Sequence, residues 1–305
     1  MHVVTRKSAT LDWLILTGLV VAWGSSFAMT KIAVAHLDAA WIMALRLSVA
    51  GLVLVPYALL SGETLLASRG VWRKFFWLAI VGHAAPFFLI SWGTHFVSSG
   101  ISGLLMGAIP LFLVVLAHFF LADERLTTPK SIGFTLGFIG IVVLIGPDKI
   151  FNLSMSGEAL WGELAILAGC LCYAVHGVTA KRMGLENPLK QSACVCLAAA
   201  LMGVVFASIV SPAGLTGKPQ AVYWAVVGLG LLPTAFATLL MYRLMLRIGP
   251  SFVAYSNYLV PVYAVLFGAL TLGETLSWNI VAALILILAG IAISRISGFR
   301  PQLSK

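Results

Sequence analysis

Long apolar runs dominate this chain and constrain its fold more than any other feature. Each run is about 20 residues long, enough for a helix to cross a hydrocarbon core roughly 30 Å thick. Of the 305 residues, 61% are hydrophobic and 10% are charged, whereas a soluble domain carries about 25% charged residues. The pattern predicts an all-α polytopic membrane protein with ten transmembrane helices, at residues 11–35, 39–61, 71–93, 98–121, 129–146, 160–181, 189–211, 222–246, 251–273 and 277–296.

The first apolar run has a second interpretation, a cleaved signal peptide. Arg6 and Lys7 precede it, and Ala33, Val34 and Ala35 resemble a signal peptidase site. The run covers 25 residues, however, and the apolar part of a signal peptide is usually about 7–15 residues long. We therefore interpret this run as the first membrane helix.

Two stretches of the chain share one pattern of residues. Each has a proline inside an apolar run, a glutamate at the end of that run and a glycine sixteen residues after the glutamate. The residues are Pro110, Glu124 and Gly140 in the first stretch and Pro261, Glu274 and Gly290 in the second. The two glutamates, like the two glycines, are 150 positions apart. The pattern predicts a first repeat at residues 1–146, a connector at 147–157 and a second repeat at 158–305.

The distribution of positive charge predicts how these repeats cross the membrane. Each repeat has five predicted helices, an odd number, so the two repeats must enter the membrane from opposite sides. If both termini are cytoplasmic, fifteen Lys and Arg residues lie inside, and only Lys31, Lys149 and Lys218 lie outside, with Arg46 within a span. We therefore expect two inverted-topology repeats in the cell inner (plasma) membrane, with both termini in the cytoplasm.

Charge and cysteine content narrow the list of partners. The net charge is +9, but the positive residues lie at helix ends without interleaved aromatic residues, so no nucleic acid partner is predicted. The four cysteines form two pairs two residues apart, whose side chains diverge by about 200° on a helix, which favours buried packing over a metal site or a disulfide. They are Cys170, Cys172, Cys194 and Cys196. We expect no cofactor and no metal. The expected partners are a small-molecule substrate and the lipid bilayer, and the oligomeric state stays open, with a monomer as one expectation.

Several short motifs together resemble a known transporter family. The segment Trp23–Phe27 is followed by Lys31 and by Arg46 in the second predicted helix, and the two Pro…Glu-x-Leu…Gly units come after them. This order resembles the EamA type of the drug/metabolite transporter superfamily over essentially the whole chain, and within it the exporters of amino acids and related metabolites. The resemblance implies a basket of ten helices around a central cavity, with the fifth and tenth helices at its base or periphery. It also implies an inner-membrane secondary transporter that exports amino acids, aromatic ones among them, or related small metabolites by alternating access.

Ionisable residues inside predicted spans are the first candidates for a binding site, because hydrocarbon disfavours charge. Arg46 lies roughly 10 Å into the second helix. It either anchors a substrate carboxylate or acts as a structural brace that reaches outward or bonds to helix-end carbonyls. His83, in the third helix, either donates to an anionic substrate or shuttles a proton, or is a neutral residue bonded to a carbonyl. His95 and His118 are weaker candidates of the same kind.

The remaining cavity candidates come from spacing along the helices. In the first and sixth helices an aromatic residue is followed three positions later by a polar residue, a combination that suits a cavity wall. In the ninth helix, bulky residues align with small residues of the fourth. The alternative in each case is ordinary helix packing. The full predicted lining is Trp23, Ser26, Thr30, Arg46, His83, Phe87, Met106, Tyr173, His176, Tyr255, Asn257 and Tyr258.

The fourth and ninth helices are the predicted moving parts. Pro110 and Pro261 each remove a backbone hydrogen bond and kink a helix. Gly103 and Gly107 allow bending or close approach beside Pro110. We predict these four residues as hinges. In the fifth helix, by contrast, glycines at positions 133, 137 and 140 form a strip for close backbone packing.

Three other functions remain as alternatives. One is efflux of cationic drugs by proton antiport, which usually needs a carboxylate inside the membrane; every Asp and Glu here lies at a predicted span end or in a connector. A second is an intramembrane protease, because residues 100–103 spell the motif GxSG around Ser102. The matching histidine motif is missing and ten helices do not fit that six-helix core, so we predict no enzyme and no catalytic residue. A third is a receptor-like membrane protein.

Overall fold

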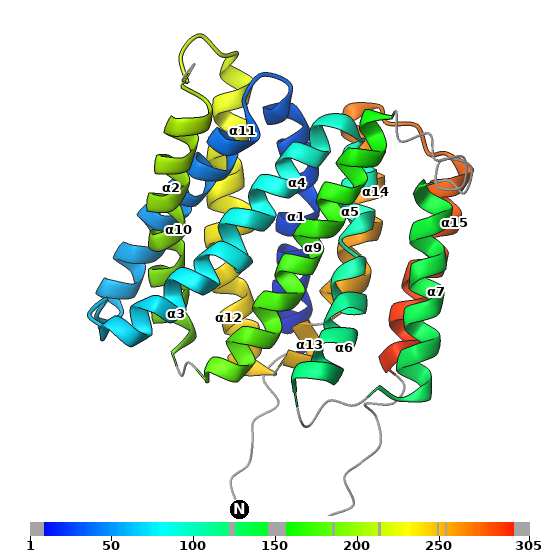
Figure 1. Ribbon diagram of the computed structural model, residues 1–305, viewed down its shortest axis with the longest axis horizontal. Helices are drawn as coiled ribbons and strands as arrows, with labels where there is room; N and C mark the ends of the chain where they lie inside the picture. The colour runs from blue at the N-terminus through cyan, green and yellow to red at the C-terminus, as the bar shows by residue number, and fades with distance from the viewer. Residues whose placement is uncertain are drawn as a thin grey trace, which may run out of the picture.

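The computed structural model describes residues 9–121, 126–145, 157–184, 187–212, 215–248, 250–253 and 255–295, and their regular secondary structure is entirely helical (Figure 1). Glu124 and Lys149 lie outside the described residues, as does nearly all of the predicted connector. The helices of the first half are α1 (Ala9–Val34), α2 (Ala39–Leu60), α3 (Arg69–Ala79), η1 (Ile80–Ala84), α4 (Ala85–Phe96), α5 (Ser99–Leu105), α6 (Ala108–Phe120) and α7 (Thr128–Ile145). Those of the second half are α9 (Glu158–Met183), α10 (Pro188–Val210), α11 (Gln220–Gly230), η2 (Leu231–Phe236), α12 (Ala237–Arg247), α13 (Pro250–Val253), α14 (Ser256–Leu272) and α15 (Trp278–Arg295).

The lengths of these helices match a membrane. Within the described residues, eight continuous helical segments are long and apolar enough to span a bilayer, and two shorter apolar helices cover Ser256–Leu272 and Trp278–Ser294. The segment Arg69–Phe96 combines α3, η1 and α4, and the segment Gln220–Arg247 combines α11, η2 and α12. The prediction of a multi-pass helical membrane protein is confirmed, whereas the count of ten membrane helices stays a prediction.

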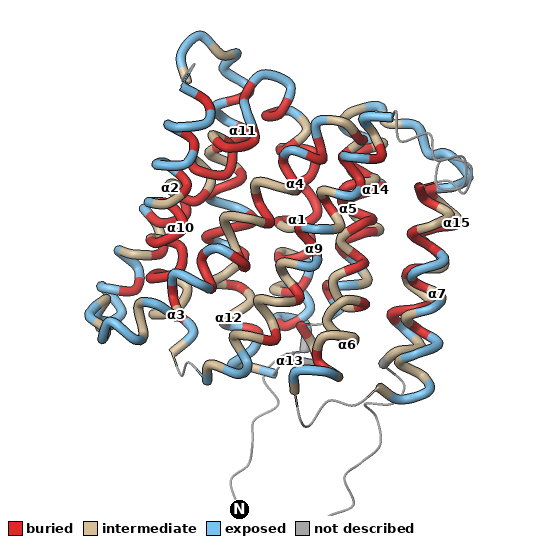
Figure 2. The backbone as a smooth tube through the Cα atoms, in the orientation of Figure 1, coloured by how far each residue is buried: buried red, intermediate tan, exposed pale blue. Residues whose placement is uncertain are grey.

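The outer surface of the bundle is apolar. Leu60, Leu270 and Trp278 are among its large apolar side chains and are 88%, 85% and 77% exposed. Figure 2 shows the exposed residues on the outward faces of the helices and the buried ones where helices meet. A protein in water rarely exposes so much contiguous apolar surface, whereas lipid chains solvate it well. The chain is therefore embedded in the membrane.

Several helix ends have local stop and start signals. Ser98 precedes α5, and its hydroxyl accepts a hydrogen bond from the backbone N–H of Ile101 at 3.2 Å. Asn187 caps α10 in the same way, ahead of a proline in the first turn. Gly184 and Gly273 end α9 and α14 with φ of 59° and 65°, which is the left-handed conformation that glycine adopts most easily.

Helices of the first half pack mainly against helices of the second half. The closest pairs are α7 with α15, α2 with α10, α4 with α9 and α1 with α14. In Figure 1, α2 and α10 lie at one edge of the bundle, and α7 and α15 stand side by side at the opposite edge. A Cβ added to Gly133 would lie 2.3 Å from the backbone oxygen of Gly290. The predicted glycine strip therefore does allow close backbone packing.

The third and eighth predicted helices are each interrupted by a π-helical segment, η1 and η2. The sequence predicts uninterrupted helices here, and the difference has a local cause. Pro86 is the second residue after the end of η1, and Pro233 lies within η2. Because a proline has no N–H, each one breaks the regular ladder of hydrogen bonds, and the backbone widens by one residue. After η1, the N–H of Ala85 bonds to the carbonyl of Ile80, five residues back.

The fourth and ninth predicted helices are also interrupted. Met106 and Gly107 separate α5 from α6, and α13 ends at Val253, three residues before α14 begins at Ser256. At the first break the N–H of Ile109 bonds to the carbonyl of Met106 at 3.1 Å, and Pro110 has no N–H to offer that carbonyl. Pro261 lies inside α14 without ending it. The predicted hinge at Gly107 therefore coincides with a break in the helix, while its movement stays a prediction.

Candidate functional site

Arg46 lies inside the bundle where α2 meets α4 and η2. Its guanidinium carbon is 3.8 Å from the centroid of the Phe87 ring, a cation–π contact. Its Nε donates a hydrogen bond to Oγ1 of Thr234 at 2.8 Å. The contacts tie the second helix of the first half to the π-helical segment of the second half. The bond to Thr234 links two helices, but its acceptor is a hydroxyl and not one of the helix-end carbonyls expected of a brace, so both interpretations of Arg46 stay predictions.

The π-helical segment η2 explains why Thr234 is available to Arg46. Pro233 has no N–H for the carbonyl of Leu229, four residues earlier. The hydroxyl of Thr234 donates to that carbonyl instead, at 2.8 Å. Since its one proton is used in this way, Oγ1 presents lone pairs to Arg46 as an acceptor. Thr234 is not among the residues predicted to line the site, and the Pro-Thr dipeptide in the eighth helix is the signal that identifies it.

Four rings continue the site from Arg46 toward α9. The ring centroid of Phe87 is 5.8 Å from that of His83 and 6.4 Å from that of Tyr173. The His83 ring in turn lies 6.1 Å from the ring of His176. The structure therefore brings together five of the predicted residues. With Thr234 they form what we call the Arg46 cluster: Arg46, His83, Phe87, Tyr173, His176 and Thr234.

The two histidines of the Arg46 cluster have unused hydrogen-bonding capacity. The Nδ1 atoms of His83 and His176 are both buried, and neither has a hydrogen-bond partner among the described residues. Buried polar atoms are nearly always paired in proteins, so such exceptions tend to mark functional positions. His176 also packs tightly against Gly82, because a Cβ added to Gly82 would lie 2.1 Å from Nδ1 of His176. Gly82 therefore provides the space that His176 occupies.

The predicted residues of α1 have hydrogen-bond partners within their own helix. Ser26 donates to the carbonyl of Trp23 at 2.6 Å, and Thr30 donates to the carbonyl of Ser26 at 2.7 Å. Both hydroxyls are buried, and Trp23 packs against the largest apolar core. Since their protons are used within α1, these two hydroxyls are available only as acceptors.

The predicted residues of the fourth and ninth helices also have other neighbours. Tyr258 donates from its hydroxyl to the carbonyl of Ile291 in α15 at 3.1 Å. Tyr255 is exposed and its ring packs near Trp13 and Phe252, while Asn257 is exposed. The sulfur of Met106 accepts a weak hydrogen bond from the thiol of Cys170 at 3.7 Å. The contacts of Met106, Tyr255 and Tyr258 are therefore made to residues outside those around Arg46.

A second polar arrangement lies at the turn between α4 and α5. Lys31 donates from Nζ to the carbonyls of Thr94, His95 and Val97, at 3.0, 3.1 and 2.6 Å. Glu274 accepts from the backbone N–H groups of residues 99 and 100, at 2.6 and 2.9 Å. A cation thus caps the negative end of α4, and an anion caps the positive end of α5. The sequence motifs containing Lys31 and Glu274 therefore hold a helix junction together.

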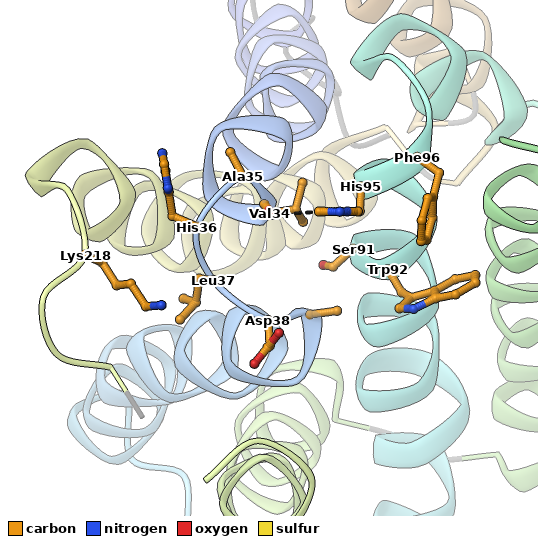
Figure 3. A pocket seen from close by; sticks show the side chains of 11 residues that line it. Val34, Ala35, His36, Leu37, Asp38, Ser91, Trp92, His95, Phe96 and Lys218 are labelled. Carbon is orange, nitrogen blue, oxygen red and sulfur yellow. Dashed lines mark hydrogen bonds between the residues drawn. The ribbon is translucent and has the colours of Figure 1, made fainter. Parts of the chain in front are cut away.

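A pocket of about 410 Å³ opens at the end of the bundle where α1 ends and α2 begins. It is lined by the loop between α1 and α2, by the end of α4 and by Lys218. In Figure 3 the rings of Trp92 and Phe96 lie on one side and the Lys218 side chain on the other, with the Asp38 carboxylate between them. Ser91 also lines the pocket, one helical turn after Phe87 on α4. The pocket therefore ends about 6 Å along α4 from the Arg46 cluster.

Two buried carboxylates lie within described helices, away from the Arg46 cluster. Asp12, in the first turn of α1, is 4% exposed and pairs with Arg247 at 2.6 Å. Glu163 is 2% exposed and lies six residues into α9, beside the close contact of Gly162 with Gly93. The sequence places both at span ends, which holds for Asp12. Glu163 also lies near the start of its helix, and the structure shows in addition that its side chain is buried.

Comparison with known proteins identifies the family. The EamA-like transporter family matches residues 12–146 and again residues 160–296. An uncharacterized transporter of Bacillus subtilis, YoaV, is 24% identical over 277 residues, covering 90% of this chain and 94% of that protein. The inner membrane transporter YedA of Escherichia coli K12, also uncharacterized, is 27% identical over 271 residues, covering 86% of this chain and 83% of that protein.

Two further similarities concern substrate and fold. A protein of Streptantibioticus cattleyicolor described as a probable terminal-alkyne amino-acid exporter is 30% identical over 267 residues, covering 86% of this chain and 84% of that protein. A crystal structure has a similar fold, with a TM-score of 0.67 at 22% sequence identity, over 96% of this chain and 100% of the other. Together these findings define a helical membrane transporter. The chain belongs to the EamA-like transporter family of the drug/metabolite transporter superfamily.

Proposed function

We propose that this protein is an inner-membrane secondary transporter that exports amino acids or related small metabolites by alternating access. The observation that carries the proposal is the Arg46 cluster, in which α2, η1 and α4 of the first half meet α9 and η2 of the second. Polar and aromatic groups with unused hydrogen bonds, buried between two halves of a membrane bundle, fit a solute site. The amino-acid exporter among the relatives supports the substrate class.

Alternating access requires two halves that move relative to each other. Ten helices in two inverted five-helix repeats supply such halves, and the pairing of contacts supports this arrangement. The first long helix, α1, packs on α14 near the end of the chain, and α9, its counterpart in the second half, packs on α6. The break between α5 and α6 is the place where we expect bending during transport.

The orientation follows from positive charge, which favours cytoplasmic termini. The pocket of Figure 3 then opens to the outside of the cell. Its inner edge at Ser91 lies one turn from Phe87, so a solute leaving the Arg46 cluster along α4 reaches this pocket next. We therefore interpret the pocket as the outer vestibule of the transport path.

Efflux of cationic drugs by proton antiport is the competing function, and the charge of the cluster disfavours it. A cationic solute near Arg46 would be repelled, and the two buried carboxylates described above lie elsewhere, on α1 and α9. A site for cations in the membrane usually contains an acidic group.

Counterflow in proteoliposomes tests the proposal. Vesicles loaded with an unlabelled amino acid should transiently accumulate the labelled one, because a carrier exposes its site to one side at a time. Arg46→Gln should strongly reduce this accumulation, and Arg243→Gln, which changes an exposed arginine of α12, should preserve it. Steady solute leakage without counterflow in the unmodified protein would contradict a carrier and indicate a channel.

A further inference from the structure

Three cations within described helices have different kinds of partner, and the difference indicates which charge a bound solute should carry. Lys31 bonds to three carbonyl oxygens at the end of α4. Arg247 is paired with the carboxylate of Asp12. Arg46 bonds to one neutral hydroxyl and lies over one ring. Among the residues that the structure describes, no carboxylate lies within salt-bridge distance of Arg46.

The uncompensated charge of Arg46 favours an anion as the missing partner. A buried cation without a counter-ion is costly in a low-dielectric interior, and a bound carboxylate offsets that cost. A single carboxylate also suits the geometry of a guanidinium, which presents two parallel N–H groups from its remaining nitrogens. Only Nε of Arg46 is used by Thr234.

The histidines extend the same preference. The Nδ1 atoms of His83 and His176 have no hydrogen-bond partner among the described residues, and each can donate to a ligand when the imidazole carries its proton on Nδ1. Tyr173, whose hydroxyl is a further donor, has its ring 6.4 Å from the ring of Phe87 that Arg46 covers. Together these residues present several donors. The hydroxyl oxygen of Thr234 already accepts a bond from Arg46 and donates one to the carbonyl of Leu229.

An ammonium group has the opposite requirements. It donates three hydrogen bonds, carries positive charge and therefore needs acceptors or a carboxylate. Beside Arg46 it would meet a like charge and an already occupied hydroxyl. A zwitterionic amino acid would be attracted to Arg46 through its carboxylate and repelled through its ammonium group. The site would therefore prefer a simple carboxylic acid to an amino acid, through repulsion of the amine as well as attraction of the carboxylate.

We propose that the Arg46 cluster selects an organic anion: a carboxylate held between Arg46 and the histidine pair, with a planar apolar body against Phe87 and Tyr173. The inference rests on the proposed transport function. Within the proposed class of amino acids and related small metabolites, it favours the related carboxylic acids that lack a free amine. The buried Nδ1 atoms become accessible when η1 separates from α9, at the contact between Gly82 and His176.

Three probes with the same phenyl ring and two-carbon chain test this selection. They are 3-phenylpropionate, an anion; L-phenylalanine, a zwitterion; and 2-phenylethylamine, a cation. We measure counterflow of each in proteoliposomes of the full chain, with the thermal stabilisation of the detergent-solubilised protein as an independent readout. The half-saturation concentration should be at least about tenfold lower for 3-phenylpropionate than for L-phenylalanine, and 2-phenylethylamine should give no counterflow.

Matched variants connect this preference to Arg46. Arg46→Gln should reduce the ratio of the half-saturation concentrations for L-phenylalanine and 3-phenylpropionate to less than about twofold. Arg243→Gln should leave this ratio unchanged. The comparison of the three probes on the unmodified protein decides the question even if Arg46→Gln does not fold.

Two contrary results are distinguishable. Stronger counterflow with L-phenylalanine than with 3-phenylpropionate, or saturable counterflow with 2-phenylethylamine, would overturn the anion selection and leave the transport function standing. If neither these probes nor any amino acid produced counterflow, the transport function and the selection would both be contradicted.

Discussion

Lys31 and Arg46 are both cations within apolar helices, and their surroundings are opposite in kind. Lys31 uses its three donors on the carbonyls at the end of α4, and Glu274 lies near enough to attract it. Arg46 uses one donor on Thr234 and rests on Phe87. A fully bonded cation stabilises a helix junction, whereas a partly bonded one keeps capacity for a ligand. The difference teaches that position inside a span does not by itself identify a binding residue.

The largest effect should come from Arg46→Ala, which removes the cation at the partly bonded site. We expect transport efficiency to fall about 100-fold, equivalent to about 2.7 kcal/mol of transition-state stabilisation. Counterflow rates at several solute concentrations give the measurement. Lys31→Ala is the matched control, and it should lower thermal stability while changing the half-saturation concentration little. A greater loss of solute affinity in Lys31→Ala than in Arg46→Ala would reverse the roles assigned to the two cations.

Glu274→Gln should destabilise the junction that Lys31 supports. The carboxylate accepts two backbone N–H bonds at the start of α5, and an amide replaces one acceptor oxygen with a donor. We expect a loss of about 2 kcal/mol in unfolding free energy, in the range for hydrogen bonds to charged groups. Titration of the purified protein with sodium dodecyl sulfate measures it. An unchanged unfolding midpoint would show that Glu274 does not hold this junction.

Thr234→Val, which changes a direct partner of Arg46, should have an intermediate effect on stability and solute affinity. It removes the acceptor for Nε and leaves the carbonyl of Leu229 without its donor. We expect a stability loss of about 1–2 kcal/mol. Solute affinity should change less than about fivefold, because the charge of Arg46 remains. Loss of affinity equal to that of Arg46→Ala would mean that Thr234 itself binds the solute.

Tyr258→Phe should have the smallest effect. The hydroxyl bonds to the carbonyl of Ile291, away from Arg46, so its removal should cost about 1 kcal/mol of stability. Solute affinity should be unchanged within about twofold. A larger fall in affinity, measured by counterflow, would favour the sequence-based prediction that Tyr258 lines the cavity.

Much of the fold could be predicted because membrane helices follow directly from apolar length. The expected start of the second helix at position 39 matches Ala39, and the expected end of the first lies one residue beyond Val34. The π-helical segments could not be predicted from hydropathy, since they arise where Pro86 and Pro233 remove single hydrogen bonds.

The candidate site was predictable to a lesser extent. Arg46 and His83 stand out in the sequence because charge and imidazole are rare inside spans. The role of Lys31 was not predictable, because it depends on where the end of α4 lies in space. For Thr234 the Pro-Thr dipeptide is a local signal, but the contact with Arg46 joins residues 188 positions apart and could not be predicted from it. The contacts of Tyr255 and Tyr258 likewise depend on packing that spacing along one helix does not determine.

The central claim is that solute binds at the Arg46 cluster, and solute protection tests it most directly. Phe87→Cys is made in a chain whose four cysteines are replaced by alanine, and a membrane-impermeant maleimide is applied to the outer face. The solute that drives counterflow should slow labelling at position 87 and leave a control cysteine at Ala35, exposed in the vestibule, unaffected. Labelling of position 87 that is unchanged at saturating solute would contradict the account.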